Sequence, residues 1–257
     1  MRIATYNVNG VNGRLPNLLD WLADTRPDVA CLQELKTTDE KFPAAALEKA
    51  GYGAIWRGQK SWNGVAILAR GCDPVETRRD LPGDPTDRQG RYIEAAVMGV
   101  VVGCLYAPNG NPVGDAKFDD KQAWYSRFMR HADWLLATGQ PVVLAGDYNI
   151  IPKDEDVYVP DRWRDDALFQ PLLKETFVWL QGRGWTDAIR RLQPEGHVYT
   201  FWKYWRNSFQ RDAGLRIDHL LLSPSLTPRL KAFGVDRAHR GREGASDHAP
   251  VWIEISR

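Results

Sequence analysis

Residues 141–149 read PVVLAGDYN, and the fold of the whole chain is best understood outward from this stretch. Its apolar part, residues 142–144, is typical of a short buried strand, and Gly146 ends that strand and allows a bound group close to the backbone. Asp147 and Asn149 then stand two apart, so an extended backbone would point both side chains the same way. The same residues also suit a plain turn. As a site, a carboxylate and an amide aimed at one point can orient a water molecule and hold a phosphoryl oxygen.

The composition is ordinary for a soluble globular enzyme. The 257 residues are 43% hydrophobic and 26% charged, with a formal net charge of +1 that neither supports nor excludes a nucleic-acid partner. The three cysteines, Cys31, Cys72 and Cys104, form no CxxC pair, which favours a reducing compartment over a disulfide framework. The sequence contains no recognisable signal peptide and no apolar run long enough to cross a bilayer, so we expect a cytoplasmic protein.

The hydrophobic pattern predicts many short strands and a few helices. Strands are expected at 2–8, 29–32, 53–57, 64–69, 75–79, 91–97, 100–106, 142–144, 197–204, 215–222, 230–236 and 250–256. Helices are expected at 15–25, 44–50, 120–137, 171–181 and 187–192. Residues 107–118 form a loop, and the polar stretch 152–167 is either a solvated loop or a loop over a substrate groove. No Pro/Ser-rich linker divides the chain, so we predict one domain, residues 1–257, with two packed, mostly antiparallel sheets flanked by helices.

Polar residues recur where these apolar strands end. They are Asn7, Glu34, Tyr106, Asp147 with Asn149, Asp218, and Asp247 with His248. Strand-end Asp and Asn are common as turn formers, but Glu34 after Cys-Leu-Gln is a poor turn former, and Asp218 lies inside the apolar run LRIDHLLL. A carboxylate in such a strand must be paired or metal-bound, because burying it alone costs too much free energy. Packed strands bring their ends together, so the sequence predicts one polar site.

The segment SDHAP, residues 246–250, offers an imidazole that either of two carboxylates can serve. The simplest arrangement has one of Asp218 and Asp247 orienting His248 and keeping it charged, while the other faces a metal ion. One Glu with one or two neighbours is the ligand number that Mg²⁺ prefers, since it keeps several waters and substrate oxygens. A permanent zinc site would need more clustered His or Cys than this chain has.

Seven stretches together resemble one family over almost the whole chain and in its order. They are YNVNG (6–10), LQELK (32–36), GQK (58–60), GVAIL (64–68), GDYNI (146–150), GLRID (214–218) and SDHAPVW (246–252). They are similar to the bacterial exonuclease III, or class II AP endonuclease, branch of the endonuclease/exonuclease/phosphatase superfamily. The resemblance implies an α/β fold, a four-layered α/β/β/α sandwich, with a divalent-metal centre at the strand ends.

The same resemblance implies a role for each polar residue. Glu34 is then the principal metal ligand, with Asn7 and Asp247 close to the ion. His248, paired with Asp218, touches the scissile phosphate. Asp147 activates the attacking water or protonates the leaving oxygen, Asn149 positions it, and Tyr106 sits against the phosphate.

DNA contacts are expected in a second set of residues. Aromatic and basic residues interleave between Tyr199 and Arg211, either as a buried aromatic strand or as a stacking surface. By resemblance, three apolar residues line a small pocket for an extruded abasic sugar, too small for a base: Phe201, Leu215 and Ile217. Candidate phosphate contacts are Lys60, Arg88, Arg91 and Asn109.

The resemblance therefore implies a Mg²⁺-dependent nuclease, for which Mn²⁺ can substitute, that acts as a monomer on duplex DNA with abasic sites or blocked 3′ ends. Expected activities are incision 5′ to abasic sites, 3′→5′ exonuclease, 3′-phosphatase and 3′-phosphodiesterase. One alternative is the same catalytic core acting on RNA or a lipid headgroup, and another is an inactive relative that only binds DNA. The complete set of eight polar residues argues against the second alternative.

Overall fold

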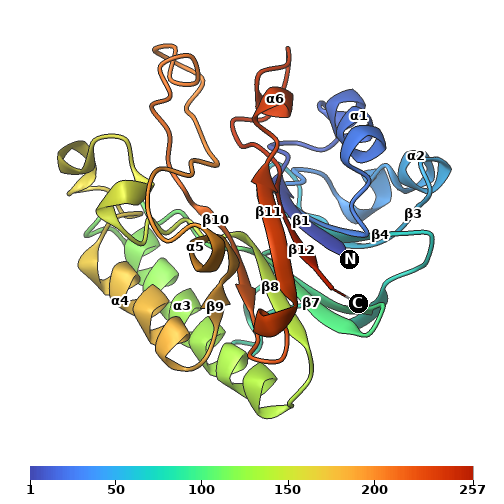
Figure 1. Cartoon of the computed structure of the whole chain (residues 1–257), viewed down its shortest axis with the longest axis horizontal. Coiled ribbons are helices and arrows are strands. Elements are labelled where there is room, and N and C mark those ends of the chain that lie inside the picture. Colours follow the sequence, from blue (N-terminus) through green and yellow to red (C-terminus); the bar gives the residue numbers. More distant parts are fainter. Residues whose placement is uncertain (257) are drawn as a thin grey trace.

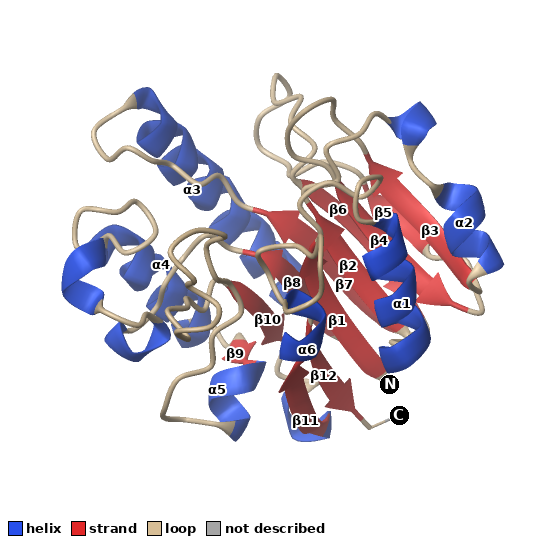
Figure 2. Ribbon diagram, turned by 90° about the horizontal axis from the view of Figure 1, so that it is seen from above, coloured by secondary structure: helices blue, strands red, loops and turns tan. Residues whose placement is uncertain are grey.

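The computed structural model describes residues 1–256 as two six-stranded sheets packed face to face, with helices on both outer faces (Figures 1 and 2). The first sheet has the order β11 (Leu230–Val235), β12 (Val251–Ile255), β1 (Arg2–Asn7), β2 (Val29–Gln33), β4 (Val65–Arg70), β3 (Tyr52–Arg57). The second has the order β5 (Val75–Arg78), β6 (Tyr92–Val97), β7 (Val100–Tyr106), β8 (Val142–Asp147), β10 (Asp218–Leu222), β9 (Thr186–Asp187). The predicted four-layered α/β/β/α sandwich is confirmed.

Helices cover the two outer faces separately. The longer ones are α1 (Leu15–Thr25) and α2 (Ala44–Lys49) on the first sheet and α3 (Ala116–Ala137) and α4 (Pro171–Gly182) on the second; α5 (Ala188–Leu192) and α6 (Arg237–Arg240) are short (Figure 2). Trp124, Phe128 and Leu135 of α3 are buried against the second sheet, as their helical spacing predicts. No helix among residues 1–256 is long and apolar enough to cross a membrane.

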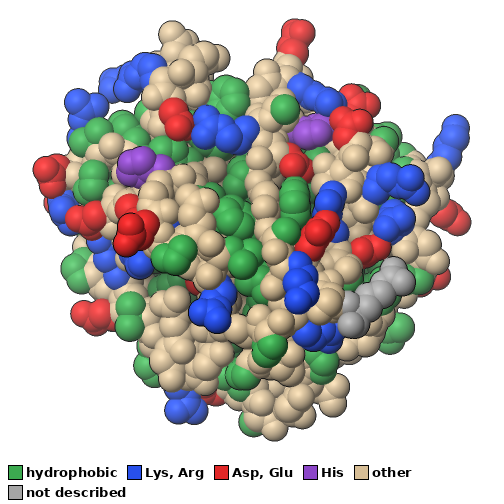
Figure 3. All heavy atoms as spheres, in the orientation of Figure 1, with side chains coloured by type: hydrophobic (Ala, Val, Ile, Leu, Met, Phe, Trp, Pro, Cys, Tyr) green, Lys and Arg blue, Asp and Glu red, His purple; other side chains and the backbone are tan. Residues whose placement is uncertain are grey.

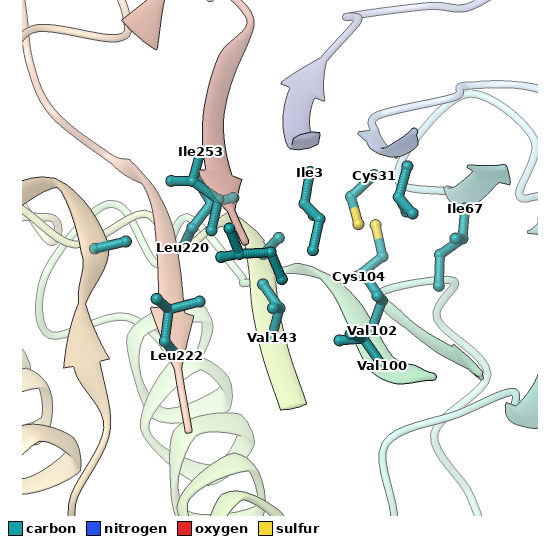
Figure 4. Packing of buried hydrophobic residues seen from close by; sticks show 14 of the residues in the cluster. Ile3, Cys31, Ile67, Val100, Val102, Cys104, Val143, Leu220, Leu222 and Ile253 are labelled. Carbon is teal, nitrogen blue, oxygen red and sulfur yellow. The ribbon is translucent and has the colours of Figure 1, made fainter. Parts of the chain in front are cut away.

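The alternation of side chains along each strand builds the core between the sheets. Ile3 points into the space between the sheets, whereas its neighbour Ala4 faces α1 and α2. Inner-face residues from both sheets, including Cys31, Cys104 and Val143, fill the interior (Figure 4). Fully burying one Val, Leu or Ile side chain contributes about 1.5–3 kcal/mol, so this layer holds the two sheets in a fixed relation.

Two parallel strand pairs place the polar strand ends at one edge. β1 runs parallel to β2, with Asn7 opposite Gln33, and β7 runs parallel to β8, with Tyr106 opposite Asp147. β10 pairs antiparallel with β8, which puts Asp218 opposite Asp147 as well. The carboxyl ends of the four parallel strands therefore meet at the upper edge in Figure 1, as expected for parallel pairs.

The structure corrects several predicted boundaries. Residues 197–204 form no strand, because Phe201 makes only isolated bridges to Leu215 and His248 while the chain crosses between the sheets. The strand predicted at 215–222 begins only at Asp218. Helix α3 begins at Ala116 rather than at 120, since the Asp115 carboxylate accepts a hydrogen bond from the backbone N–H of residue 117 and caps the helix.

The decisive stretch itself extends further than predicted, since β8 continues to Asp147. Gly146 is required there, but for a different reason from the one inferred. A Cβ at this position would collide with the backbone carbonyl of Leu105 in β7, so the close neighbour is the adjacent strand rather than a bound group.

Candidate active site

Asn7, at the end of β1, holds two carboxylates side by side. Its Nδ2 donates to Glu34 Oε1 and to Asp147 Oδ2, at 2.9 Å each. Its Oδ1 accepts the backbone N–H of Asn9 at 3.0 Å, which fixes the orientation of the amide. Asn7 thus links one carboxylate from each sheet. Asp147, one of the two, lies 140 residues from Asn7 in the sequence.

Glu34 follows β2 with a backbone φ of 52°, a left-handed conformation that is uncommon for a residue with a side chain. Such backbone conformations concentrate at functional sites. Lys36 Nζ lies 2.8 Å from Glu34 Oε2. Burial opposes ionisation of Glu34, but the hydrogen bond and charge of Lys36 and the bond from Asn7 outweigh it and hold the pKa of Glu34 below its usual value. Glu34 is therefore a carboxylate at neutral pH.

His248 is a buried imidazole with a carboxylate on each side. Its Nδ1 lies 2.9 Å from Asp218 Oδ2, and Thr200 Oγ1 donates to the same oxygen at 2.6 Å. Its Nε2 faces Asp147 Oδ2 at 3.7 Å. Burial lowers the pKa of His248, but the charge and hydrogen bond of Asp218 and the charge of Asp147 raise it, with the net result of about 10. His248 is therefore an imidazolium at neutral pH, and its Nε2–H points into the site.

Asp147 titrates near neutral pH. Burial raises its pKa to about 7, with His248 and the Asn7 hydrogen bond opposing and the charges of Asp218 and Glu34 adding to the rise. Its Oδ1 accepts the backbone N–H of Asn149 at 2.9 Å. A carboxyl group with a pKa near 7 can both accept and return a proton, which is what acid–base catalysis requires.

Asn149 and Tyr106 flank these carboxylates. Asn149 has a left-handed φ of 49°, and its Nδ2 donates to the Ala107 carbonyl at 2.9 Å. Burial and the charge of Glu34 raise the pKa of Tyr106 well above 10, so its hydroxyl stays protonated. The Arg91 guanidinium lies 4.9 Å from the centre of the Tyr106 ring and fixes it from behind.

The donor set fits a divalent cation with few protein ligands. Ligand atoms of Glu34, Asp147 and His248 all lie within 4.8 Å of one another. His248 is protonated and paired, and the raised pKa of Asp147 suits it to proton transfer, so the Glu34 carboxylate, which is ionised at neutral pH, is the member of this group best suited to hold a cation. Hard oxygen donors in this number suit Mg²⁺ or a similar ion. Asp247 lines the same cavity outside this group of three, with Oδ1 accepting from Asn9 Nδ2 at 3.0 Å.

A cavity of about 260 Å³ joins the polar groups to an apolar pocket. It is lined by Glu34, Tyr106, Asn109, Asn111, Asp147, Asn149, Trp163, Asp166, Leu168, Phe201, Lys203, Leu215, Ile217, Asp247 and His248. The structure thus gathers six of the eight predicted polar residues and all three predicted pocket residues in one space. The other two polar residues lie just behind it, Asn7 beneath the carboxylates and Asp218 behind His248.

The four candidate phosphate contacts divide into two pairs. Asn109 lines the cavity, and Arg91 lies beside it against Tyr106. Lys60 and Arg88 are exposed and lie outside the residues that line it. In the interleaved aromatic segment, Trp202 is fully buried, whereas Tyr204 and Trp205 are 47% and 60% exposed.

Arg216 supports the pocket from behind. It lies between two pocket residues, Leu215 and Ile217, and its guanidinium faces the other way, with Nε 2.7 Å from Asp156 Oδ1 and Nη1 2.8 Å from Asp187 Oδ2. Arg216, Asp156 and Asp187 are all buried. Burial lowers the pKa of Arg216, but the charges of the two carboxylates outweigh burial and raise that pKa overall. This network ties the 152–167 loop to the pocket wall, and Trp163 and Asp166 of the same loop line the cavity, so the loop borders the site rather than being merely solvated.

Several site residues were not identified from the sequence. Lys121, fully buried in α3, donates from Nζ to the carbonyls of Asn109 (2.9 Å), Asn149 (2.7 Å) and Ala167 (3.4 Å). Burial lowers the pKa of Lys121 to about 7, against the charges of Asp147 and the nearby Asp166. A lysine on the apolar side of a helix is a signal that could have revealed it. Lys36, Asn9, Thr200, Trp163, Asp166, Leu168 and Lys203 were also missed as site residues.

This fold and site define an α/β-sandwich hydrolase that cleaves phosphodiesters. The chain belongs to the Endonuclease/Exonuclease/phosphatase family, whose model matches residues 4–248. It is 32% identical over 269 residues to exodeoxyribonuclease III of Haemophilus influenzae, covering 99% of this chain and 100% of that protein.

Solved structures agree over the full length. The 3′-5′ exonuclease NExo of Neisseria meningitidis is 41% identical with a TM-score of 0.97, and each chain is covered completely. NExo from Neisseria, as a 3′ phosphatase bound to a product DNA hairpin, also matches at 41% identity with a TM-score of 0.95 and complete coverage. An AP endonuclease from Archaeoglobus fulgidus is 30% identical with a TM-score of 0.96, again with complete coverage of both chains.

Proposed function

We propose that this protein is a Mg²⁺-dependent DNA repair nuclease. It hydrolyses the phosphodiester 5′ to abasic sites in duplex DNA and also has 3′→5′ exonuclease, 3′-phosphatase and 3′-phosphodiesterase activities. The observation that carries the proposal is the juxtaposition of Glu34, Asp147 and an imidazolium, His248, within 4.8 Å at the mouth of a small apolar pocket. The relatives named as exonuclease, 3′ phosphatase and AP endonuclease support the same chemistry on DNA.

Each polar group has a role that follows from its contacts. The Nε2–H of His248 donates to a phosphate oxygen, and Asp218 keeps that imidazole charged and correctly rotated. Asp147, with a pKa near 7, takes a proton from the attacking water or returns one to the leaving oxygen, and Asn149 positions the reacting oxygen. Glu34 would hold the divalent ion, with Asn7 and Asp247 close by. The bound ion would neutralise charge on the phosphate.

Substrate selection follows from the pocket. Phe201 lies edge-on to His248 with ring centres 4.9 Å apart, and Leu215 and Ile217 complete the apolar wall. An extruded sugar without a base fits such a wall, and the phosphate 5′ to it then lies beside His248. The cavity of about 260 Å³ must also hold the phosphate, so a sugar that still carries its base would need more space than remains.

A duplex with one internal tetrahydrofuran, a neutral abasic analogue, tests the proposal directly. With a 5′ label and Mg²⁺ present, we expect a single incision 5′ to the analogue, followed by shortening from the new 3′ end. EDTA should abolish both, and Mn²⁺ should restore them. Binding without incision at saturating Mg²⁺ would instead identify an inactive relative, and faster turnover of RNA or a lipid headgroup would identify a different phosphodiesterase.

A further inference from the structure

Lys203 lines the same cavity as the catalytic groups but has a different environment from the other cations there. Its Nζ lies 4.5 Å from the ring centre of Trp163 and 5.6 Å from that of Trp205. Within residues 1–256, no carboxylate oxygen lies within 4.0 Å of this ammonium. Two aromatic faces therefore hold the charge in place without neutralising it.

Other charged groups in and beside the cavity already have hydrogen-bond or ion-pair partners; Asp147 accepts from Asn7 Nδ2, and Asp247 accepts from Asn9 Nδ2. Lys36 is bound to Glu34, and His248 is bound to Asp218. Asp166, the carboxylate on the loop that carries Trp163, accepts from Asn111 Nδ2 at 3.0 Å and from the backbone N–H of residue 168 at 2.9 Å. Of the two cations that line the cavity in residues 1–256, His248 is paired with Asp218 and is assigned to the scissile phosphate, whereas Lys203 has no carboxylate partner and can meet a further charge on the substrate.

The charge of Lys203 matters for the group that is attached to the scissile phosphate and enters the pocket. In an internal abasic site the group that enters the pocket is a neutral sugar. In a 3′-phosphate end no group follows the phosphorus, and the monoester carries up to one additional negative charge near neutral pH. In a 3′-phosphoglycolate end the entering group is small and ends in a carboxylate. Both blocked ends place an anion where the neutral sugar has none.

We propose that Lys203 gives this enzyme a preference for DNA 3′ ends blocked by a small anionic group over internal neutral abasic sites. The inference rests on the proposed function and names the substrate class that the same site favours. The Lys203 ammonium pairs with the extra charge of the monoester or with the carboxylate of the blocking group. Phe201, Leu215 and Leu168 limit the size of that group.

The test compares three substrates and three variants. Duplexes carry a 3′-phosphate at a nick, a 3′-phosphoglycolate at a nick, or an internal tetrahydrofuran. Lys203→Met removes the charge and keeps the length of the side chain, and Lys203→Arg keeps the charge. Lys231→Met is the matched control, because Lys231 is exposed on β11, outside the cavity. For each pair, kcat/KM is measured with Mg²⁺, and Kd is measured in EDTA, where no turnover occurs.

We expect Lys203→Met to lower kcat/KM about tenfold for both anionic ends, and less than twofold for tetrahydrofuran, as for loss of one charge-assisted contact. The Kd values in EDTA should change in the same order, and Lys203→Arg should retain most of the preference. Equal losses on all three substrates, or no loss on the anionic ends, would overturn the inference. If the wild-type protein cleaves none of the three, the proposed function fails, while the Kd comparison still decides whether Lys203 recognises the anionic group.

Discussion

Replacing Asp218 by Asn isolates the electrostatic role of the buried pair at the centre of the site. The substitution keeps the size of the side chain and removes its charge, 2.9 Å from His248 Nδ1. Thr200 Oγ1, now 2.6 Å from Asp218 Oδ2, can still donate to the amide oxygen, so local packing should survive. The variant therefore changes the charge state of His248 more than its position.

The size of the effect follows from the pKa of His248. Its rise from 6.5 to about 10 corresponds to about 5 kcal/mol at 1.36 kcal/mol per pH unit. Burial lowers the pKa of His248, and Asp218 is the largest cause of its rise, ahead of Asp147 and Asp247, so Asp218→Asn should lower this pKa strongly, back toward its ordinary value. Because the folded pKa is raised, this stabilisation is complete below pH 6.5 and is lost as pH rises through about 10. The variant should therefore lose up to about 5 kcal/mol of unfolding free energy near pH 6, and less as pH approaches 10.

The assay combines imidazole ¹⁵N NMR in EDTA with urea unfolding between pH 6 and 10 and with kcat at pH 8 with Mg²⁺. In the wild type, both nitrogens of His248 should be protonated at pH 8; in the variant, one should lose its proton, and kcat should fall about 100-fold or more. Glu94→Gln is the matched control. It removes the β6 carboxylate that lies 2.9 Å from the buried His131 of α3, so it should cost stability with little effect on kcat. A fully protonated His248 at pH 8 in Asp218→Asn would refute the reasoning.

Four other substitutions test separate parts of the site. Glu34→Ala and Asp147→Asn should each lower kcat by about 100-fold or more at saturating Mg²⁺, measured by gel assay, because each removes an essential acid; near wild-type turnover in either would remove its assigned role. Phe201→Ala should reduce abasic-site cleavage more than 3′-phosphate removal, since only the former fills the pocket, and equal losses would count against the pocket. Lys121→Met leaves three buried carbonyls without their donor and should lower the unfolding free energy by about 3 kcal/mol in urea titrations. An unchanged midpoint with an unchanged slope would show that Lys121 holds nothing in place.

The charge on the surface gives little indication of where DNA binds. Lys and Arg side chains are interspersed with Asp and Glu on the face shown in Figure 3, in keeping with the net charge of +1. The features that set this site apart are the geometry of the cavity and the projecting loop with exposed Tyr204 and Trp205, orange at the top of Figure 1. Exposed aromatic side chains of this kind can stack on bases.

Local sequence signals determined most of the secondary structure. The hairpin turn at Met98 and Gly99 is an example, because both residues have positive φ values, 49° and 81°, as a tight turn between β6 and β7 demands. Short-range apolar patterns likewise predicted nearly all strands and five of the six helices, with small errors at their ends. Strand ends carrying Glu34, Asp147 and Asp218 were also visible in the sequence, because a carboxylate within or directly after an apolar run needs a charged or hydrogen-bonding partner to offset its burial.

Only the tertiary structure decided how those groups pair. The residue pattern alone left open whether Asp218 or Asp247 serves His248, although the family resemblance implied Asp218. The β8–β10 register puts Asp218 opposite Asp147, and its carboxylate lies beside the His248 imidazole. The sequence also left Lys203 among a run of aromatic and basic residues, with no indication that its charge faces the cavity. The physical reason is that strand propensity and turn geometry act over a few residues, whereas the partner of a buried charge is set by contacts across two packed sheets.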